Sequence, residues 1–333
     1  MKKKFMAVLM IFAIIILAAA PALAKTYKWK LAHTRSPEAQ IHKDLTEFAE
    51  KVQKETNGEV QISVMAGGQL GDWSVVQERV SMGNVEMTCG PMSTAVDKRL
   101  EMTNLCAAVT DWDKVATSYI SGTPFIDQIA NWVGEQNLTI LTTYPFYLGG
   151  LGFTKEIDDP ANPALKRGLK LRIPSMVTFR HMVEGLGYIP TPIAWGDTFT
   201  AMQTGVVDGV AGTGAEGCCT NGFVDVMKSY LPINTHFELW YMMVNTDKFK
   251  KLPEEYQNVI IKLAKEIEQK RLVEGPKETA KWEQVMRDKG VVVYNLTDEQ
   301  IQAYHEIIRN ATWPATRELV GADVFDAAVK YLQ

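Results

Sequence analysis

The chain has few of the residues from which catalytic and metal centres are usually built. Its 333 residues include four cysteines and five histidines. No C-x-x-C or H-x-x-x-H spacing occurs to suggest a metal site, and no G-x-S-x-G motif suggests a serine nucleophile. The glycines of residues 67–71 form a turn, but they lack a Walker or dinucleotide pattern. We therefore expect no catalytic residue, no metal and no cofactor.

The cysteines are too few to form a disulfide framework. Four cysteines allow three pairings, and the sequence does not choose between them. Cys218 and Cys219 are adjacent in the chain, and a disulfide between neighbours is strained. We expect free thiols, or one bridge at most. A buried vicinal thiol pair is our preferred interpretation of Cys218 and Cys219, and a thiol nucleophile at either position is the alternative.

Beyond its first residues the chain has no apolar run of membrane-spanning length. Residues 1–24 show the three parts of a secretory signal peptide: basic Lys2–Lys4, an apolar stretch over 5–20, and a small-x-small site that ends at Ala24. An uncleaved membrane anchor is the alternative, because the uncharged run is almost long enough to span a bilayer. Pro21 favours cleavage, which predicts a periplasmic protein.

The chain also has no excess of positive charge. Its formal net charge is −4, and loss of residues 1–24 would remove three lysines and no acid, which makes it about −7. A mildly acidic exported protein is not a nucleic-acid binder by electrostatics. An anionic ligand would have to be captured by a local site.

Apolar runs and amphipathic stretches alternate along the rest of the chain, which is too long for one comfortable core. A β-α-β order implies mostly parallel sheets flanked by helices, with ligands beyond the carboxyl ends of the strands. A long helical region extends from about 248 to 288, with a kink expected at Gly275-Pro276. The pattern predicts strands over 27–32, 60–65, 85–89, 138–144, 169–173 and 206–210. It predicts helices over 41–56, 73–82, 123–135, 177–186, 198–204 and 325–332.

Arg172 is the most informative single residue. It lies inside a short apolar run, Gly168-Leu-Lys-Leu-Arg-Ile-Pro-Ser175, that reads as a strand. A guanidinium in such a setting needs an anionic partner, because it cannot lose its proton and is costly to bury alone. That partner is either a structural Asp or Glu, or a ligand.

Together with other segments, this run resembles the solute-binding proteins of tripartite ATP-independent periplasmic (TRAP) transporters, of the DctP type. The resemblance covers essentially the whole mature chain. Its segments are Glu55-Thr-Asn-Gly-Glu-Val-Gln-Ile-Ser63, Gly67-Gly-Gln-Leu-Gly71, Gly168–Pro174, Pro190-Thr-Pro192, Ala201-Met-Gln-Thr-Gly-Val-Val-Asp-Gly209 and Leu252-Pro-Glu-Glu-Tyr-Gln257.

The resemblance implies an α/β fold of two lobes, with a hinged cleft between them and a long helix that spans both. We expect lobe 1 to comprise 25–146 and 238–277, and lobe 2 to comprise 147–237 and 278–333. The ligand would bind in the cleft, and the loaded receptor, expected to be a monomer, would dock on the small and large permease subunits.

The family's pocket can be carried onto this chain position by position. An arginine that matches Arg172 grips the ligand's carboxylate in the family, and its planar fork of donors suits a carboxylate or a sulfonate. Trp195 matches an aromatic wall, and Asp197 falls where the family usually has Glu; it could instead cap the helix that starts at Thr198. The predicted ligand-binding residues are Thr34, Met92, Thr94, Arg172, Ser175, Trp195, Asp197, Gly212, Thr213 and Trp240.

Two departures from the family narrow the ligand. Many members have a second arginine where this chain has Gly149, and an Asn where it has Gly212. A pocket with one arginine, several aromatics and small residues suits a small monoanion. Candidates are a short hydroxy- or oxo-acid, an aromatic acid, or a small sulfonate such as isethionate. The alternatives to a transport receptor are a ligand-sensing partner of a membrane receptor and a thiol-dependent periplasmic hydrolase.

Overall fold

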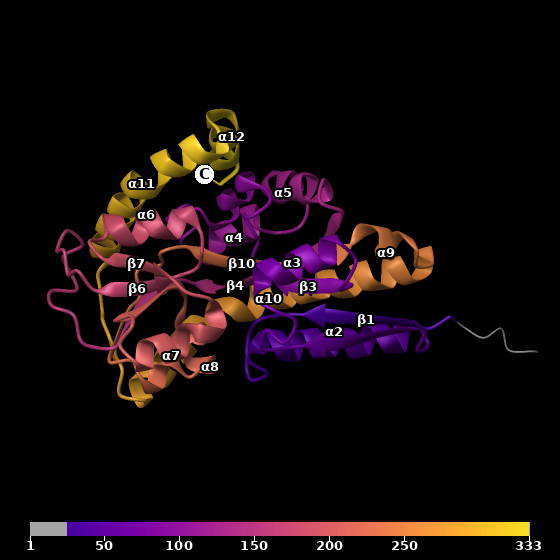
Figure 1. The fold of residues 1–333 in the computed structure, drawn as a ribbon, viewed down its shortest axis with the longest axis horizontal. Helices are drawn as coiled ribbons and strands as arrows, with labels where there is room; N and C mark the ends of the chain where they lie inside the picture. The colour runs from indigo at the N-terminus through magenta and orange to yellow at the C-terminus, as the bar shows by residue number, and fades with distance from the viewer. Residues whose placement is uncertain (1–24, 333) are drawn as a thin grey trace, which may run out of the picture.

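The computed structural model describes residues 25–332, so the predicted signal peptide lies outside the described residues. Two mixed β-sheets, each flanked by helices, form two lobes (Figure 1). We call the elements around the five-stranded sheet the first lobe, and those around the six-stranded sheet the second lobe. The two-lobe α/β architecture expected from the sequence is confirmed. Within the described residues, no helix has the length and apolar character needed to cross a bilayer.

The first lobe is built on five strands that include the chain's longest. β1 pairs in parallel with β2 and β3, whereas β10 runs antiparallel between β3 and β4. Because of β10 the sheet is mixed rather than mostly parallel. In spatial order its strands are β2 (Val60–Met65), β1 (Tyr27–Ala32), β3 (Met87–Gly90), β10 (Phe237–Asn245) and β4 (Leu138–Leu148). Its helices are α2 (Gln40–Glu55), α3 (Trp73–Ser81), η1 (Lys98–Asn104), α4 (Trp112–Ser118), α5 (Pro124–Gly134) and α9 (Thr246–Lys250).

The second lobe carries the arginine strand in the interior of its sheet. β6 pairs in parallel with both β7 and β8, so both edges of its backbone are hydrogen-bonded within the sheet. In spatial order its strands are β11 (Val292–Val293), β9 (Ser229–Leu231), β5 (Gly150–Phe153), β8 (Gly209–Thr213), β6 (Lys170–Ile173) and β7 (Ile189–Pro192). Its helices are α6 (Val177–Gly185), η2 (Trp195–Asp197), α7 (Thr198–Gln203), α8 (Ala215–Thr220) and η3 (Phe223–Asp225).

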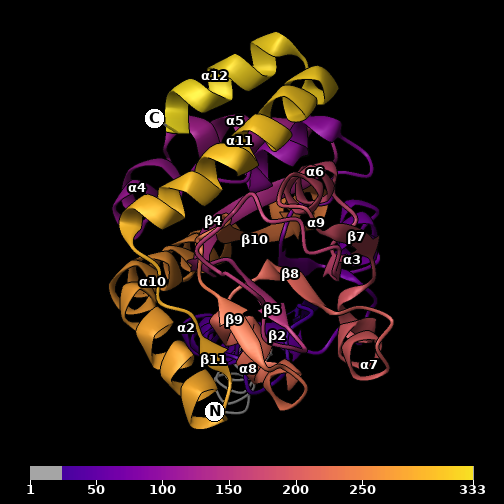
Figure 2. The same cartoon turned by 90° about the vertical axis from the view of Figure 1, so that its left-hand side faces the viewer.

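The chain crosses between the lobes several times. It passes from β4 directly into β5, and returns from β9 to β10; at this crossing the backbones of Gly149 and residues 235–236 exchange hydrogen bonds of 2.8 and 2.9 Å. Figure 2 shows the long helix α10 (Glu254–Asp288) along one side of the molecule. Its first half packs in the core under β10, and its Met286 packs in a core of the second lobe. The helix continues through Pro276.

We expected residues 278–333 to belong to the second lobe. The C-terminal part of this segment instead lies against the first lobe. α11 (Asp298–Val320) packs against α6 at its start, but its last residue, Val320, enters the core of the first lobe. α12 (Ala322–Leu332) then lies beside α5 (Figure 2). Phe325 and Leu332 are buried there in the same apolar cluster as Phe125. The apolar face of α12 completes the first lobe's core, which places this segment in that lobe.

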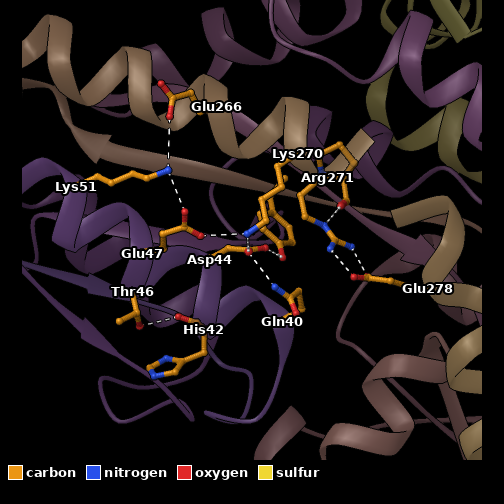
Figure 3. A network of polar contacts seen from close by, with 12 residues as sticks. Gln40, His42, Asp44, Thr46, Glu47, Lys51, Glu266, Lys270, Arg271 and Glu278 are labelled. Atoms are coloured by element: carbon orange, nitrogen blue, oxygen red, sulfur yellow. Dashed lines mark hydrogen bonds and ion pairs between the residues drawn. The ribbon is translucent and has the colours of Figure 1, made fainter. Parts of the chain in front are cut away.

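A polar network fastens α10 to α2 above their apolar contact (Figure 3). Lys270 of α10 donates to the Asp44 and Glu47 carboxylates of α2, at 2.9 and 3.1 Å. Lys51 bridges Glu47 at 2.9 Å and Glu266 at 3.7 Å. The spanning helix is therefore fixed to the first lobe along its N-terminal half.

Candidate functional site

A cavity lies where the two lobes meet, beside the β4–β5 and β9–β10 crossings. The first lobe contributes residues after β1 and β3 and residues of β10, as expected for strand ends that face a cleft. The second lobe contributes the end of β6, η2 and β8. The cavity volume is about 30 Å³, and the lining residues are Thr34, Arg35, Trp73, Pro91, Asn104, Arg172, Pro174, Met176, Phe179, Trp195, Gly212, Glu238 and Trp240.

A second cavity adjoins the first and shares Arg172, Trp73 and Pro174 with it. Its volume is about 140 Å³, and its wall is more polar than that of the first. It is lined also by Asp72, Ser74, Ser93, Thr94, Ala95, Ser175, Ile193 and Ala194. Arg172 thus stands between an inner, aromatic cavity and an outer cavity that offers hydroxyl groups.

Arg172 is buried at this junction without an anionic partner. Its side chain is 2% exposed, and its Nε donates to the carbonyl oxygen of Ile193 at 2.8 Å. Among residues 25–332, neither terminal nitrogen of Arg172 has a protein acceptor or forms an ion pair. Burial, followed by the positive charge of Arg35, lowers the pKa of Arg172 to about 10, so the guanidinium remains charged at neutral pH. Its donors are available to an anion in the cavities.

Arg35 is a second buried guanidinium in the cavity, and it did not appear among the predicted site residues. It follows β1 in the first lobe, is 3% exposed, and donates to the Tyr147 hydroxyl. Its Cζ lies 3.9 Å from the ring centroid of Trp195 in the second lobe and 5.0 Å from that of Trp240. Its Nε is buried without a hydrogen-bond partner among the described residues. Arg35 thus reaches from one lobe to the aromatic wall of the other.

Glu238 on β10 is the cavity's buried carboxylate. Its Oε1 lies 3.7 Å from Arg35 Nη2 and accepts from Trp240 Nε1 at 2.5 Å. Its Oε2 lies 3.0 Å from His236 Nε2, and His236 Nδ1 lies 2.9 Å from the Thr235 hydroxyl. Burial alone would raise the pKa of Glu238, but the hydrogen bond with His236, together with Arg35 and Trp240, holds it below its usual value. The carboxylate is therefore ionised at neutral pH.

The sequence contains a pattern that could have indicated both Glu238 and Arg35 as site residues. Glu238 is a single acid within the apolar run Phe237–Asn245, the same kind of pattern that drew attention to Arg172. Arg35 follows directly on His33-Thr34, which the pattern places at a strand end. No strand is predicted over β10, so Glu238 could not be positioned by sequence.

The structure brings most of the predicted site residues to the two cavities. Thr34, Arg172, Trp195, Gly212 and Trp240 line the inner cavity. Ser175 and Thr94 line the outer one.

Three predicted residues lie elsewhere. Met92 is fully buried in the core of the first lobe, where its apolar side chain packs. The Thr213 hydroxyl lies 3.1 Å from the Tyr147 hydroxyl and is absent from both cavity linings. Asp197 is exposed; it precedes α7 but its side chain makes no capping hydrogen bond and does not support Arg172. The turn of η2 directs Trp195, and not Asp197, toward the cavity.

Two glycines explain the departures from the expected pocket. Gly212 has φ +76°, and a Cβ there would lie 2.6 Å from Pro174 Cδ, so no Asn fits without moving the segment after Arg172. At Gly149 a Cβ would overlap the ring of His236. His236 therefore occupies the space that a side chain at 149 would need.

The cysteines offer no reactive thiol. All four are free; Cys89, Cys106 and Cys218 are buried, and Cys219 is partly buried. Burial raises the pKa of Cys219 to about 12, and that of Cys218 above its usual range. Thiols in such surroundings are poor nucleophiles. Within residues 25–332 there is also no cluster of three or more His, Cys, Asp or Glu side chains that could hold a metal ion.

Comparison with known proteins gives one consistent result. Residues 31–316 match the sequence model of a protein family, the bacterial extracellular solute-binding proteins of family 7, DctP. The C4-dicarboxylate-binding periplasmic protein DctP of Rhodobacter capsulatus is 25% identical over 323 residues, which cover 93% of this chain and 92% of that protein.

Solved structures share the fold over nearly the whole chain. A TRAP periplasmic solute-binding protein from Desulfovibrio salexigens with bound orotic acid has a TM-score of 0.82 at 20% identity, covering 92% of this chain and 100% of that one. One from Roseobacter denitrificans with bound L-galactonate has a TM-score of 0.78 at 21% identity, covering 93% of this chain and 99% of that one.

Proposed function

This chain belongs to family 7 of the bacterial extracellular solute-binding proteins, and we propose that it is the receptor of a TRAP transporter for a small organic monoanion. The ligand is a hydroxy-, oxo- or aromatic monocarboxylate, or a small sulfonate such as isethionate. It binds between the lobes, and the protein delivers it without chemical change to the membrane permease. Residues 1–24 direct the receptor to the periplasm.

The observation that carries this proposal is the buried, unpaired Arg172. Burying a guanidinium without an anion is costly, so the cavity is complete only when a ligand supplies the missing charge. Two parallel N–H donors from Nη1 and Nη2 match the two oxygens of a carboxylate. The bound orotic acid and L-galactonate of the structural relatives are likewise carboxylic acids, and the name of the Rhodobacter relative specifies a C4-dicarboxylate.

The ligand couples binding to closure because its contacts come from both lobes. Arg172 and Trp195 belong to the second lobe, whereas Arg35 and Trp240 belong to the first. An anion between the two guanidinium groups favours the closed state through this differential affinity. Hydroxyl groups of Ser175 and Thr94 in the outer cavity can satisfy a third oxygen, which a sulfonate would need.

The test is thermal unfolding of residues 25–333, refolded to remove carried-over ligand, with a panel of small carboxylates and sulfonates. An anion at 1,000 times its dissociation constant should raise the melting temperature by about 5–10 °C. Arg172→Ala should abolish that shift, because the lost contact is worth about 3–5 kcal/mol. Arg180→Ala, which removes an exposed arginine of α6, should keep it.

Absence of a shift with every anion would contradict the receptor function. A shift of equal size in the Arg172→Ala protein would instead show that Arg172 is structural.

A further inference from the structure

The inner cavity holds an unequal number of buried charges. Arg35 and Arg172 each carry one positive charge, and Glu238 carries one negative charge. Their exposed fractions are 3%, 2% and 6%, so all three lie largely outside the screening of water. The cavity therefore has a net charge of about +1, which one anionic group neutralises and two would reverse.

The carboxylate of Glu238 is held in place by hydrogen bonds, so its negative charge is a fixed part of the cavity. Trp240 and His236 each engage one of its carboxylate oxygens, at 2.5 and 3.0 Å. His236 is itself held by Thr235 at 2.9 Å and contacts Phe179 edge-on. The carboxylate is thus fixed in the wall by donors that belong to the protein, and a ligand is not needed to satisfy it.

Arg35 is held beside Glu238 by contacts with aromatic side chains. Its Cζ lies within 3.9 Å of the Trp195 ring centroid and 5.0 Å of the Trp240 centroid, and it donates to Tyr147. Its nearest carboxylate contact is Glu238, at 3.7 Å. Much of the charge of Arg35 is therefore already balanced, whereas Arg172 forms no ion pair among the described residues. The charge of Arg172 is favoured only at longer range, by the carboxylate of Asp72 in the wall of the outer cavity and then by that of Glu238.

We propose that Glu238 is a specificity-determining residue that restricts the ligand to a single negative charge. This inference rests on the proposed function and deepens it. A monoanion pairs with Arg172 and leaves the cavity near neutrality. In the inner cavity a second carboxylate lies close to Glu238, where two buried like charges repel each other in a medium of low dielectric constant. In the outer cavity the carboxylate of Asp72 opposes a second negative charge.

The test compares two ligands of one skeleton that differ by one charge: succinate, a dianion, and succinamate, its monoamide monoanion. Their dissociation constants are measured by competition against the anion that gives the largest thermal shift. The wild type should favour succinamate. In Glu238→Gln, which keeps the shape and an acceptor oxygen, the ratio of the two constants should shift toward succinate by on the order of 10- to 100-fold.

Arg35→Gln provides the opposite change, since it lowers the cavity's net charge by one. It should shift the ratio further toward succinamate, and it reports on the cavity's charge even if Glu238→Gln folds poorly. A ratio that is unchanged in both variants would overturn the inference, and so would failure of both compounds to bind any variant that still binds the reference anion. If no anion binds the wild type at all, the proposed function fails and this inference fails with it.

Discussion

The buried carboxylate of Glu216, which joins the two lobes at a second point, should make the protein's stability depend on pH. Glu216 lies on α8 of the second lobe and is 2% exposed. Its Oε1 accepts from the backbone N–H of Gln40, at the start of α2 in the first lobe, at 3.2 Å. Its Oε2 is buried without a partner among the described residues. Burial raises the pKa of Glu216 to about 7, although the charge of Arg271 opposes the shift.

This raised pKa sets the sign of the pH dependence. The folded protein keeps the Glu216 proton up to about pH 7, whereas the unfolded chain releases it near the ordinary value of 4.5. The stability that the protonated group contributes is therefore complete below about pH 4.5, and it is lost as the pH rises through about 7. The gap between the two pKa values corresponds to about 3 kcal/mol.

The assay is urea unfolding of the wild type and of Glu216→Gln, which is neutral at every pH and can still accept from Gln40. The free energy of unfolding of the variant should exceed that of the wild type by about 1 kcal/mol at pH 5 and about 3 kcal/mol at pH 8. Glu156→Gln, which changes an exposed carboxylate, should show no such trend. An equal difference between Glu216→Gln and wild type at both pH values would show that Glu216 does not have a raised pKa in the folded protein.

Three further predictions concern packing. Arg271→Ala should lower the free energy of unfolding by about 3–5 kcal/mol in urea, because it leaves Glu278, bound at 2.7 and 3.0 Å, without its buried partner; Glu278→Gln in the same chain should recover part of the loss. Gly212→Asn should lower it by about 1–3 kcal/mol and weaken anion binding, because the new side chain displaces Pro174; unchanged binding would contradict this. Iodoacetamide at pH 8 should modify Cys218 only after unfolding, as mass spectrometry can show; rapid native labelling would be inconsistent with its burial.

Local patterns along the chain were sufficient for much of the fold. The strands over 27–32 and 60–65 have the bounds of β1 and β2, and Asp72 caps α3 as its position before the helix indicates. Such elements are defined by alternation and capping, which act between near neighbours. β10 was not found, because a strand buried on both faces has no alternation to distinguish it. The antiparallel course of that strand is what makes the first sheet mixed.

The sequence could identify a site residue where a single charged side chain lies within an apolar strand. Arg172 is such a residue, and its position in the sequence alone indicates that its guanidinium needs an anionic partner. Arg35 and Glu238 are 203 positions apart in the chain, and their 3.7 Å contact depends on the return of the chain to the first lobe in β10. The single-arginine pocket expected from Gly149 is therefore wrong in its count. Our proposal of a monoanion rests instead on the net charge of about +1, in which Glu238 offsets Arg35.

A crystal structure of residues 25–333 with the anion that gives the largest thermal shift would show directly whether Arg172 binds the ligand. We expect its carboxylate or sulfonate oxygens within hydrogen-bond distance of Nη1 and Nη2 of Arg172, with the rest of the ligand between Trp195 and Trp240. An anion bound elsewhere, or a protein carboxylate paired with Arg172 in the complex, would show that Arg172 does not hold the ligand.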